Sequence, residues 1–206
     1  MNPDILTVVS VDVLLLRYDR PTGRVLLHLD RRALDPYAGR LALPGVAART
    51  GERLASAADR ACRKVEGTPR ALGQLRTFDE PSRDPRGASL SIAMWAVLAP
   101  DEPASGAVPI AGVPPLPFDH DIIVATCRPM LAALLWRDVT FTRALTGDVF
   151  TSTDAVVLAR ELTGRDPHRA NLNREVGAVP GLVADGTAPT AGGRPPKQWR
   201  WTDADA

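Results

Sequence analysis

The sequence predicts an α/β domain followed by a smaller domain of two helices and a β-hairpin. Residues 7–100 contain β-rich runs around one helical segment, and a longer helical segment follows at 118–137. After residue 137 the pattern changes to short helices, and residues 181–201 contain two strand-like runs around a Gly/Pro-rich tip. We therefore expect domains at residues 1–137 and 138–206.

The composition is that of an ordinary globular protein, with 45% hydrophobic and 24% charged residues among 206. A run of about 18 apolar residues, which a membrane-spanning helix needs, does not occur in the sequence. The first ten residues do not resemble a signal peptide. Cys62 and Cys127 lack CxxC or Cys/His spacing. We expect a cytoplasmic protein, not associated with a membrane, with two reduced and partly buried thiols.

The expected elements of the first domain follow from hydrophobic periodicity and turn signals. The 118–137 helix has Asp119 as its N-cap residue, and Pro129 is expected to kink it or split it into two. The 52–67 helix is expected to end at Gly67. The predicted strands are 7–19, 24–32, 71–79 and 88–100, with a short edge strand at 107–112.

Residues 43–68, LPGVAARTGERLASAADRACRKVEGT, resemble the loop–helix signature of the Nudix family, GX5EX7REUXEEXGU. The resemblance covers roughly residues 7–120 and implies an α+β Nudix-like sandwich. Without a gap, Glu52, Arg60 and Gly67 fall on matching positions of the signature. Its other three glutamates are replaced in this sequence by Ala61, Lys64 and Val65.

Hydrolysis of a diphosphate in this family needs Mg²⁺ or Mn²⁺, and these hard cations prefer oxygen ligands. With the carboxylates replaced, we expect no metal site, no catalytic residues and no required cofactor. Glu52 and Arg60 are expected to brace the loop against the helix. The alternative is an active hydrolase of ADP-ribose-like nucleoside diphosphates with a rearranged metal site, using Glu52, Glu66 or an acid of residues 80–84.

Residues 76–87, RTFDEPSRDPRG, resemble a segment of Nudix proteins that handle ADP-ribose. Asp84 and Arg86 are candidates for contacts to ribose or phosphate, since arginine makes bidentate contacts to phosphate oxygens. Phe78 either stacks on a base or belongs to the core. DPRG is also a good turn sequence. Arg40, from the GRLALPG segment, completes the expected ligand-binding set.

The second domain begins with a strong helix signal in residues 150–164, FTSTDAVVLARELTG. Thr151 and Asp154 form an Asp variant of the capping box, and Gly164 is expected to end the helix. A second helix is expected to start at Asp166 and Pro167. The residues expected in the core are Val157, Leu158 and Leu162 of the first helix and Ala170, Leu172 and Val176 of the second.

A helix, a glycine-containing turn and a polar-basic helix form the order of a helix-turn-helix. The strand-like GLVA and KQWRW segments then predict a wing, although a disordered basic tail is the alternative. Arginine and asparagine are residue types that contact base edges and phosphates. The expected DNA-binding residues are Arg165, His168, Arg169, Asn171, Asn173 and Arg174, with Arg194 and Lys197 on the wing.

Taken together, the chain resembles the Nudix-related transcriptional regulators of the NrtR type. The segments that carry the resemblance are GRLALPG, TFDEPSRDPRG, LPFDHDIIV, FTSTDAVVLARELTGRD, NLNREV and GGRPPKQWRW. The resemblance implies a homodimer that binds a double-stranded DNA operator, represses transcription and responds to ADP-ribose or a related nucleotide. NAD-related genes are the typical targets of this family, although some of its members control sugar genes instead. A protein-interaction scaffold, whose winged domain binds another protein, is a further alternative.

Overall fold

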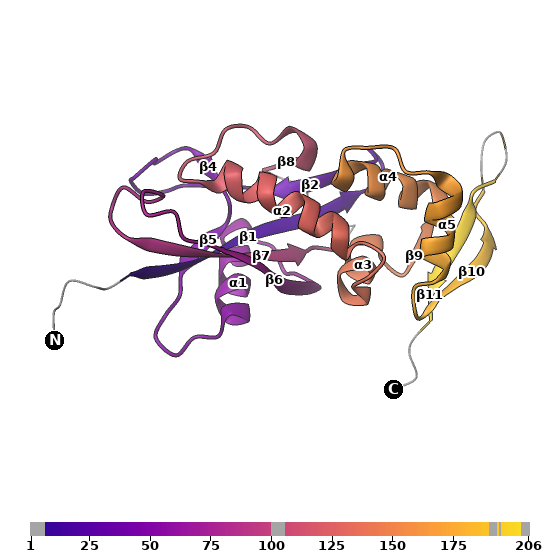
Figure 1. Cartoon of the computed structure of the whole chain (residues 1–206), viewed down its shortest axis with the longest axis horizontal. Helices are drawn as coiled ribbons and strands as arrows, with labels where there is room; N and C mark the ends of the chain where they lie inside the picture. Colours follow the sequence, from indigo (N-terminus) through magenta and orange to yellow (C-terminus); the bar gives the residue numbers. More distant parts are fainter. Residues whose placement is uncertain (1–6, 100–105, 190–192, 194, 203–206) are drawn as a thin grey trace.

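The computed structural model describes residues 7–99, 106–189, 193 and 195–202 (Figure 1). The elements of the first part are β1 (Val8–Asp19), β2 (Arg24–His28), β3 (Asp30–Arg31), β4 (Leu41–Ala42), β5 (Gly45–Ala47), α1 (Leu54–Cys62), the 3-10 turn η1 (Arg63–Val65), β6 (Ala71–Phe78), β7 (Ser89–Val97), β8 (Ala107–Pro109), the 3-10 turn η2 (Ile110–Gly112) and α2 (His120–Leu134). Those of the second part are α3 (Val139–Thr146), β9 (Val149–Thr151), α4 (Ser152–Thr163), α5 (Arg169–Gly177), β10 (Leu182–Thr187) and β11 (Lys197–Trp201).

A mixed sheet forms the centre of the first part, with the strand order β6-β7-β1-β2-β8 and β5 paired to β1. β1 and β2 form the predicted antiparallel hairpin, whereas β1 and β7 run parallel. In Figure 1, α1 lies on one side of this sheet and α2 on the other. The predicted α+β sandwich is therefore confirmed.

β1 is buried on both faces, because its side chains alternate between two hydrophobic clusters. Val11, Val13 and Leu15 pack in one cluster with buried residues of α1. Leu14, Leu16 and Tyr18 belong to the other, which also contains residues of α2 and of the second part of the chain. The position of β1 between the two layers explains why its sequence is an almost continuous apolar run.

Pro129 does not divide the helix in which it lies, as α2 runs through it to Leu134. A proline removes one helical hydrogen bond, here the bond to the carbonyl group of Ala125. Pro129 and Ala125 are both exposed, and at the surface solvent replaces such a bond. Asp119 occupies the predicted N-cap position but its side chain makes no capping hydrogen bond. The alternative of two separate helices was therefore wrong, and the kink at Pro129 stays a prediction.

The end of α1 also differs from the prediction, because Glu66 and not Gly67 adopts the left-handed conformation, with φ 57°. α1 stops at Cys62 and continues as η1. Gly67 is required for a different reason. A Cβ atom there would lie 2.9 Å from a Leu15 methyl group and 3.2 Å from one of Leu98. This glycine therefore lets the chain pass close to the sheet.

The second part has the predicted winged helix-turn-helix order, with α4 and α5 followed by the β10–β11 hairpin. The capping box of α4 is confirmed, with Thr151 accepting from the amide of Asp154 and Asp154 accepting from that of Thr151. Gly164 ends the helix with φ 74°. A third strand, β9, was not predicted and pairs with β11.

α5 begins later than its sequence signals predict. His168, not Asp166, occupies the N-cap position, and the helix starts at Arg169. The Asp166 carboxylate instead lies 3.7 Å from the Arg160 guanidinium. Ala170, expected in the core, is exposed, while Leu172 and Val176 are buried as predicted. Both the helix start at Asp166 and the burial of Ala170 were therefore wrong.

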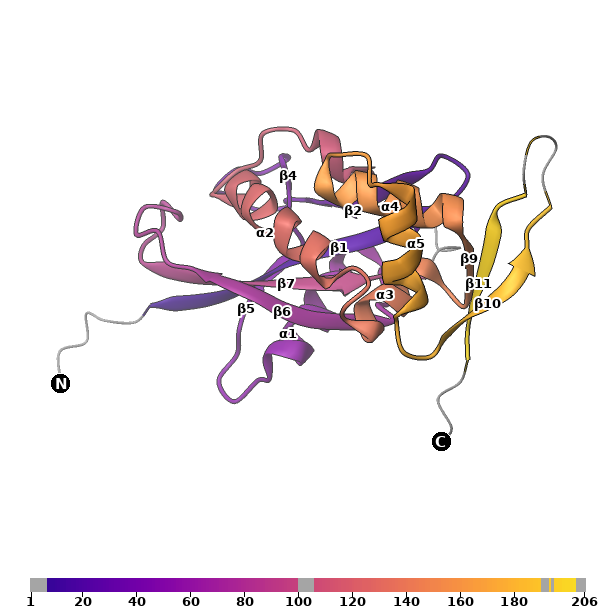
Figure 2. The same cartoon turned by 45° about the vertical axis from the view of Figure 1, so that its right-hand side comes forward.

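The two parts of the chain pack against each other, as both Figure 1 and Figure 2 show. α4 contacts β2 and α2, and α3 contacts β1, β6 and β7. One buried cluster contains Leu14 of β1, Cys127 of α2, Leu158 of α4 and Trp199 of β11. The domain boundary near Arg137 stays a prediction, because this cluster extends across it.

Candidate functional site

A cavity of about 550 Å³ lies at the amino-terminal end of β1. Its walls come from β1, β5, η1, the loop between β6 and β7, and the segment that leads into α2. The sheet places all of these at one end, because β1 and β7 run parallel and both begin there. The charged residues that line it are Asp12, Arg32, Lys64, Arg83, Asp84 and Arg86.

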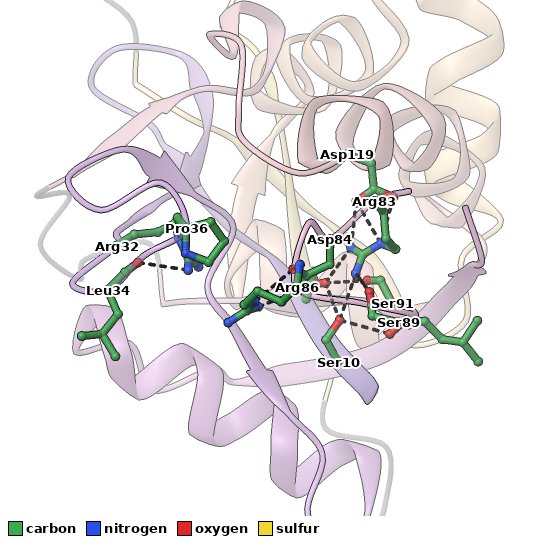
Figure 3. A network of polar contacts seen from close by, with 12 residues as sticks. Ser10, Arg32, Leu34, Pro36, Arg83, Asp84, Arg86, Ser89, Ser91 and Asp119 are labelled. Carbon is green, nitrogen blue, oxygen red and sulfur yellow. Dashed lines mark hydrogen bonds and ion pairs between the residues drawn. The ribbon is translucent and has the colours of Figure 1, made fainter. Parts of the chain in front are cut away.

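A buried ion-pair network forms one side of the cavity (Figure 3). The Arg83 guanidinium donates three hydrogen bonds of 2.7–3.1 Å to the carboxylate of Asp119. It also reaches Asp12 and the hydroxyl of Ser89, each at 3.4 Å. Breaking one partner from such a buried pair leaves an uncompensated charge, so this network fixes the loop between β6 and β7 against β1 and α2.

Asp12 and His120 extend the network beneath the cavity. The Ser91 hydroxyl donates to Asp12 at 2.6 Å. His120 Nε2 lies 3.7 Å from Asp12, and its Nδ1 accepts from the backbone amide of Leu43 at 3.0 Å. Burial lowers the pKa of His120, although the Asp12 and Asp119 carboxylates oppose this shift. A neutral imidazole with its proton on Nε2 satisfies both contacts.

The exposed side of the cavity carries a second arginine–aspartate pair. Arg86 donates to Asp84 from Nε at 3.0 Å and from Nη2 at 2.7 Å (Figure 3). This bond lowers the pKa of the Asp84 carboxyl group and raises that of Arg86. The Arg86 side chain is 60% exposed, so the pair lies where a ligand can reach it.

Phe118 provides an aromatic surface at the cavity. The Arg32 guanidinium lies 4.7 Å from the centre of its ring, and the Tyr37 ring meets it edge-on at 5.0 Å. Arg32 donates hydrogen bonds to the carbonyl groups of Pro36 and Leu34 (Figure 3). Because these acceptors are uncharged, they orient the guanidinium without neutralising it.

Two of the four predicted ligand-binding residues line this cavity, namely Asp84 and Arg86. Phe78 and Arg40 are not among the described residues that line it. Phe78 ends β6 beside the Arg76 guanidinium, and Arg40 hydrogen-bonds the carbonyl of Pro115. The ligand contacts of all four residues stay predictions.

The helix that resembles the Nudix signature keeps its predicted brace. Arg60 donates two hydrogen bonds to Glu52, at 3.1 and 2.8 Å, and a third to the carbonyl of Ala47. The hydrogen bonds from Arg60, together with one from the backbone amide of Arg49, lower the pKa of Glu52 to about 2. Both carboxylate oxygens of Glu52 are therefore bonded to the Arg60 guanidinium.

The positions of the missing glutamates do not provide a metal site. Ala61 is fully buried and Val65 is half-buried. The Lys64 ammonium pairs with Asp30 and lies 3.4 Å from the carbonyl oxygen of Gly45. Within the described ranges, no three His, Cys, Asp or Glu side chains are grouped as a metal site requires. The residues at these positions therefore do not fit a divalent cation.

The predicted DNA-binding residues that the structure describes are all exposed: Arg165, His168, Arg169, Asn171, Asn173, Arg174 and Lys197. Arg194 lies outside the described residues. At about 100° per residue, Ala170 and Arg174 lie about 160° around α5 from the buried Leu172. Ala170 and Arg174 therefore form the outermost line of the helix, and Asn171 accepts a 2.9 Å hydrogen bond from Arg174.

The other predicted DNA-binding residues lie in different surroundings on α5 and on the wing. His168 and Asn171 line a hollow between α5 and the end of α2, beside Trp136. On β11, the Lys197 ammonium lies 3.9 Å from the ring centre of Trp199. Arg200 is paired with Asp185 across the hairpin. The wing thus presents Lys197, whereas the charge of Arg200 is largely compensated.

Comparison with solved structures relates both parts of the chain to one known protein. NrtR of Shewanella oneidensis, in complex with a 27mer DNA, aligns over 94% of this chain and 93% of its own, with a TM-score of 0.76 and 24% identity. The chain has the fold of NrtR. The likeness to NrtR includes the small C-terminal part. No protein-family model matches the chain, and no curated protein matches it.

Other solved structures are also similar, and two of them are described here. A MutT/nudix family protein of Enterococcus faecalis covers 97% of this chain and 89% of its own, with a TM-score of 0.74 and 18% identity. The NUDIX domain of Shewanella oneidensis NrtR, complexed with ADP ribose, covers 64% of this chain and 94% of its own, with a TM-score of 0.52 and 26% identity. The predicted two-part fold of the NrtR type is therefore confirmed.

Sequence reasoning missed most of the cavity wall. Arg83 was inside the segment singled out for Asp84 and Arg86, yet its partner Asp119 is 36 residues away and was assigned to a helix cap. Phe118 immediately precedes that aspartate. A buried charge needs a partner of opposite charge. This rule would have singled out Asp12, which is the acidic residue in the middle of an apolar run.

Proposed function

We propose that this protein is a ligand-responsive DNA-binding regulator, which acts as a homodimer in the cytoplasm. The observation that carries the proposal is the exposed Arg/Asn face of α5, in helix-turn-helix order. This face occurs in a chain with the fold of NrtR, a protein whose crystal structure has been determined in complex with DNA. Arginine and asparagine at helical spacing bind phosphates and base edges in a major groove.

The effector that we propose is ADP-ribose or a related nucleotide, bound in the cavity beside Phe118. The NUDIX domain of NrtR binds ADP ribose, and the cavity combines an aromatic ring with several cations. Such a ligand favours a dimer geometry that no longer matches the operator. To move the population from mostly bound to mostly released, it must prefer one state by about 5 kcal/mol. Repression of NAD-related genes is part of this proposal.

We further propose that the protein does not hydrolyse the nucleotide. Arg60 holds Glu52, and Lys64 stands where the signature has a metal ligand. The alternative of a rearranged site has an exposed Glu66 in its favour but no grouped carboxylates among the described residues. Incubation of the protein with ADP-ribose and Mg²⁺, followed by chromatography for AMP, tests this: sustained AMP release contradicts the proposal.

The regulator proposal is tested by fluorescence anisotropy on the protein's own upstream DNA and on a scrambled duplex. We expect tighter binding to the upstream DNA, with log affinity falling steeply against log salt concentration. Arg174→Ala should weaken binding by about 1–3 kcal/mol if Arg174 reads a base, or reduce the salt slope by about one if it contacts a phosphate. Arg63→Ala, on η1, is the matched control.

The outcomes separate the alternatives. Release of the upstream DNA by ADP-ribose supports both the DNA and the effector proposals. Equal and weak binding to both duplexes, without an effect of Arg174→Ala, contradicts regulation of that promoter and favours a protein-interaction role for the winged part. Light scattering at the same protein concentration tests the homodimer.

A further inference from the structure

The contacts of Lys64 point to a function for the residue that interrupts the metal-binding pattern. Its ammonium group pairs with Asp30 of β3 and lies 3.4 Å from the carbonyl oxygen of Gly45 at β5. It also lines the cavity, together with Gly45 itself. A positive group is thus held by a carboxylate and a backbone carbonyl, which are the ligand types that a hard divalent cation takes.

We propose that the cavity binds the diphosphate group of a nucleoside diphosphate without a divalent metal, and that the Lys64 ammonium supplies the positive charge instead. This inference rests on the proposed nucleotide effector and adds how the site holds it. In a hydrolase, a cation both binds the diphosphate and activates water. A lysine ammonium binds the diphosphate only, so the ligand is retained without being cleaved.

The charges of the cavity agree with an anionic ligand. Four lining residues are positive (Arg32, Lys64, Arg83, Arg86) and two are negative (Asp12, Asp84), which leaves two positive charges in excess. Both aspartates form ion pairs within the cavity wall, Asp12 with Arg83 and Asp84 with Arg86. Arg32 therefore carries a charge that no described carboxylate offsets, because its described hydrogen bonds go to carbonyl groups. Lys64 also presents its ammonium to the cavity, although Asp30 pairs with it from outside the ligand space.

The hydrogen-bonding capacity of Lys64 leaves room for a ligand. An ammonium group has three donors. Asp30 and the Gly45 carbonyl take two of them, and the third is left for a phosphate oxygen. Asp30 is only 13% exposed and is not among the described residues that line the cavity, so it holds the ammonium from outside the ligand space.

The chain offers a matched control in Arg63, the neighbour of Lys64 on η1, which is exposed and is not among the described residues that line the cavity. ADP-ribose binding to the full-length protein is measured by calorimetry, first in EDTA and then in Mg²⁺. We expect binding in EDTA, with an affinity that Mg²⁺ changes less than about two-fold. Lys64→Met should weaken binding by about ten-fold or more, since a hydrogen bond to a charged group is lost. Lys64→Arg should restore much of the affinity, and Arg63→Met should leave it unchanged.

A charge reversal gives a second readout. Lys64→Glu should abolish binding in EDTA and make whatever affinity remains dependent on Mg²⁺. This substitution restores the glutamate that the Nudix signature has at this position, and a carboxylate is a ligand for Mg²⁺. Thermal melting of each variant checks that it is folded. The inference is overturned if the wild-type protein binds ADP-ribose only with Mg²⁺, if it does not bind it at all, or if Lys64→Met binds as tightly as wild type. None of these results affects specific binding to the upstream DNA, so the regulator proposal is judged separately.

Discussion

The hydroxyl group of Tyr18, on β1, donates a 2.8 Å hydrogen bond to Asp154 Oδ1, in the first turn of α4. The other oxygen of Asp154 accepts from the amide and the hydroxyl of Thr151, in the capping box. One carboxylate therefore joins the central strand of the sheet to the start of the helix-turn-helix. Burial and the bond to Asp154 both raise the pKa of Tyr18, which is therefore protonated and donates at neutral pH.

Replacing Tyr18 with phenylalanine should lower the free energy of unfolding by about 1 kcal/mol, the usual net value of a hydrogen bond. Urea unfolding monitored by circular dichroism measures the change. Tyr37→Phe is the control, because this tyrosine is 36% exposed. Equal stability of Tyr18→Phe and wild type would show that the bond does not contribute.

Replacing Gly67 with alanine should destabilise the fold by about 1–3 kcal/mol, the cost of overpacking. The new methyl group would lie 2.9 Å from Leu15, in a fully buried position of the sheet. Gly112→Ala is a matched control, since a Cβ atom there meets nothing within 4 Å. A Gly67→Ala protein as stable as Gly112→Ala would contradict the close approach.

The Glu52–Arg60 brace should make stability depend on acid pH. Because the folded pKa of Glu52 is lowered from 4.5 to about 2, its contribution is present above pH 4.5 and is lost as the pH falls towards 2. Glu52→Gln should therefore melt below wild type at pH 7, with a difference that shrinks between pH 4.5 and 2. Glu66→Gln, at an exposed residue, is the control. A difference in melting temperature that is constant over this pH range would refute the brace.

The two thiols should be inert in the folded protein. Burial raises the pKa of Cys62 to about 12 and that of Cys127 to about 11, and both side chains are fully buried. Because the thiolate is the reactive form, neither should react with a disulfide reagent at pH 8, and both should react after unfolding in urea. Fast labelling of one thiol in the native protein would show that its element opens.

Local signals predicted the elements whose determinants are local. The capping box of Thr151 and Asp154 and the glycine end of α4 were predictable because both lie within a few residues of the helix. The hairpin of β1 and β2 was predictable for the same reason. The late start of α5 was not predicted: His168 occupies the N-cap position, and the exposed Asp166 carboxylate lies 3.7 Å from Arg160 of the previous helix.

The cavity was harder to predict, since its residues are brought together by the sheet. Asp12, Arg83 and Asp119 are far apart in the sequence, and nothing near Asp12 indicates its partners. β9 is three residues long and exists through its pairing with β11, about 50 residues away. The replacement of the metal-binding glutamates was visible in the sequence, but the contacts of Lys64 with Asp30 and Gly45 were not.

The buried cluster contains residues of both β1 and β11, so the parts before and after residue 137 share one hydrophobic core. Two modules connected by a loose tether would melt independently, and a protease would separate them. Here the sheet and the helix-turn-helix share apolar contacts, so the chain should denature in one cooperative step. If the protein binds DNA as proposed, a mutation that weakens the cavity half would also lower the occupancy of DNA, even when it lies far from α5.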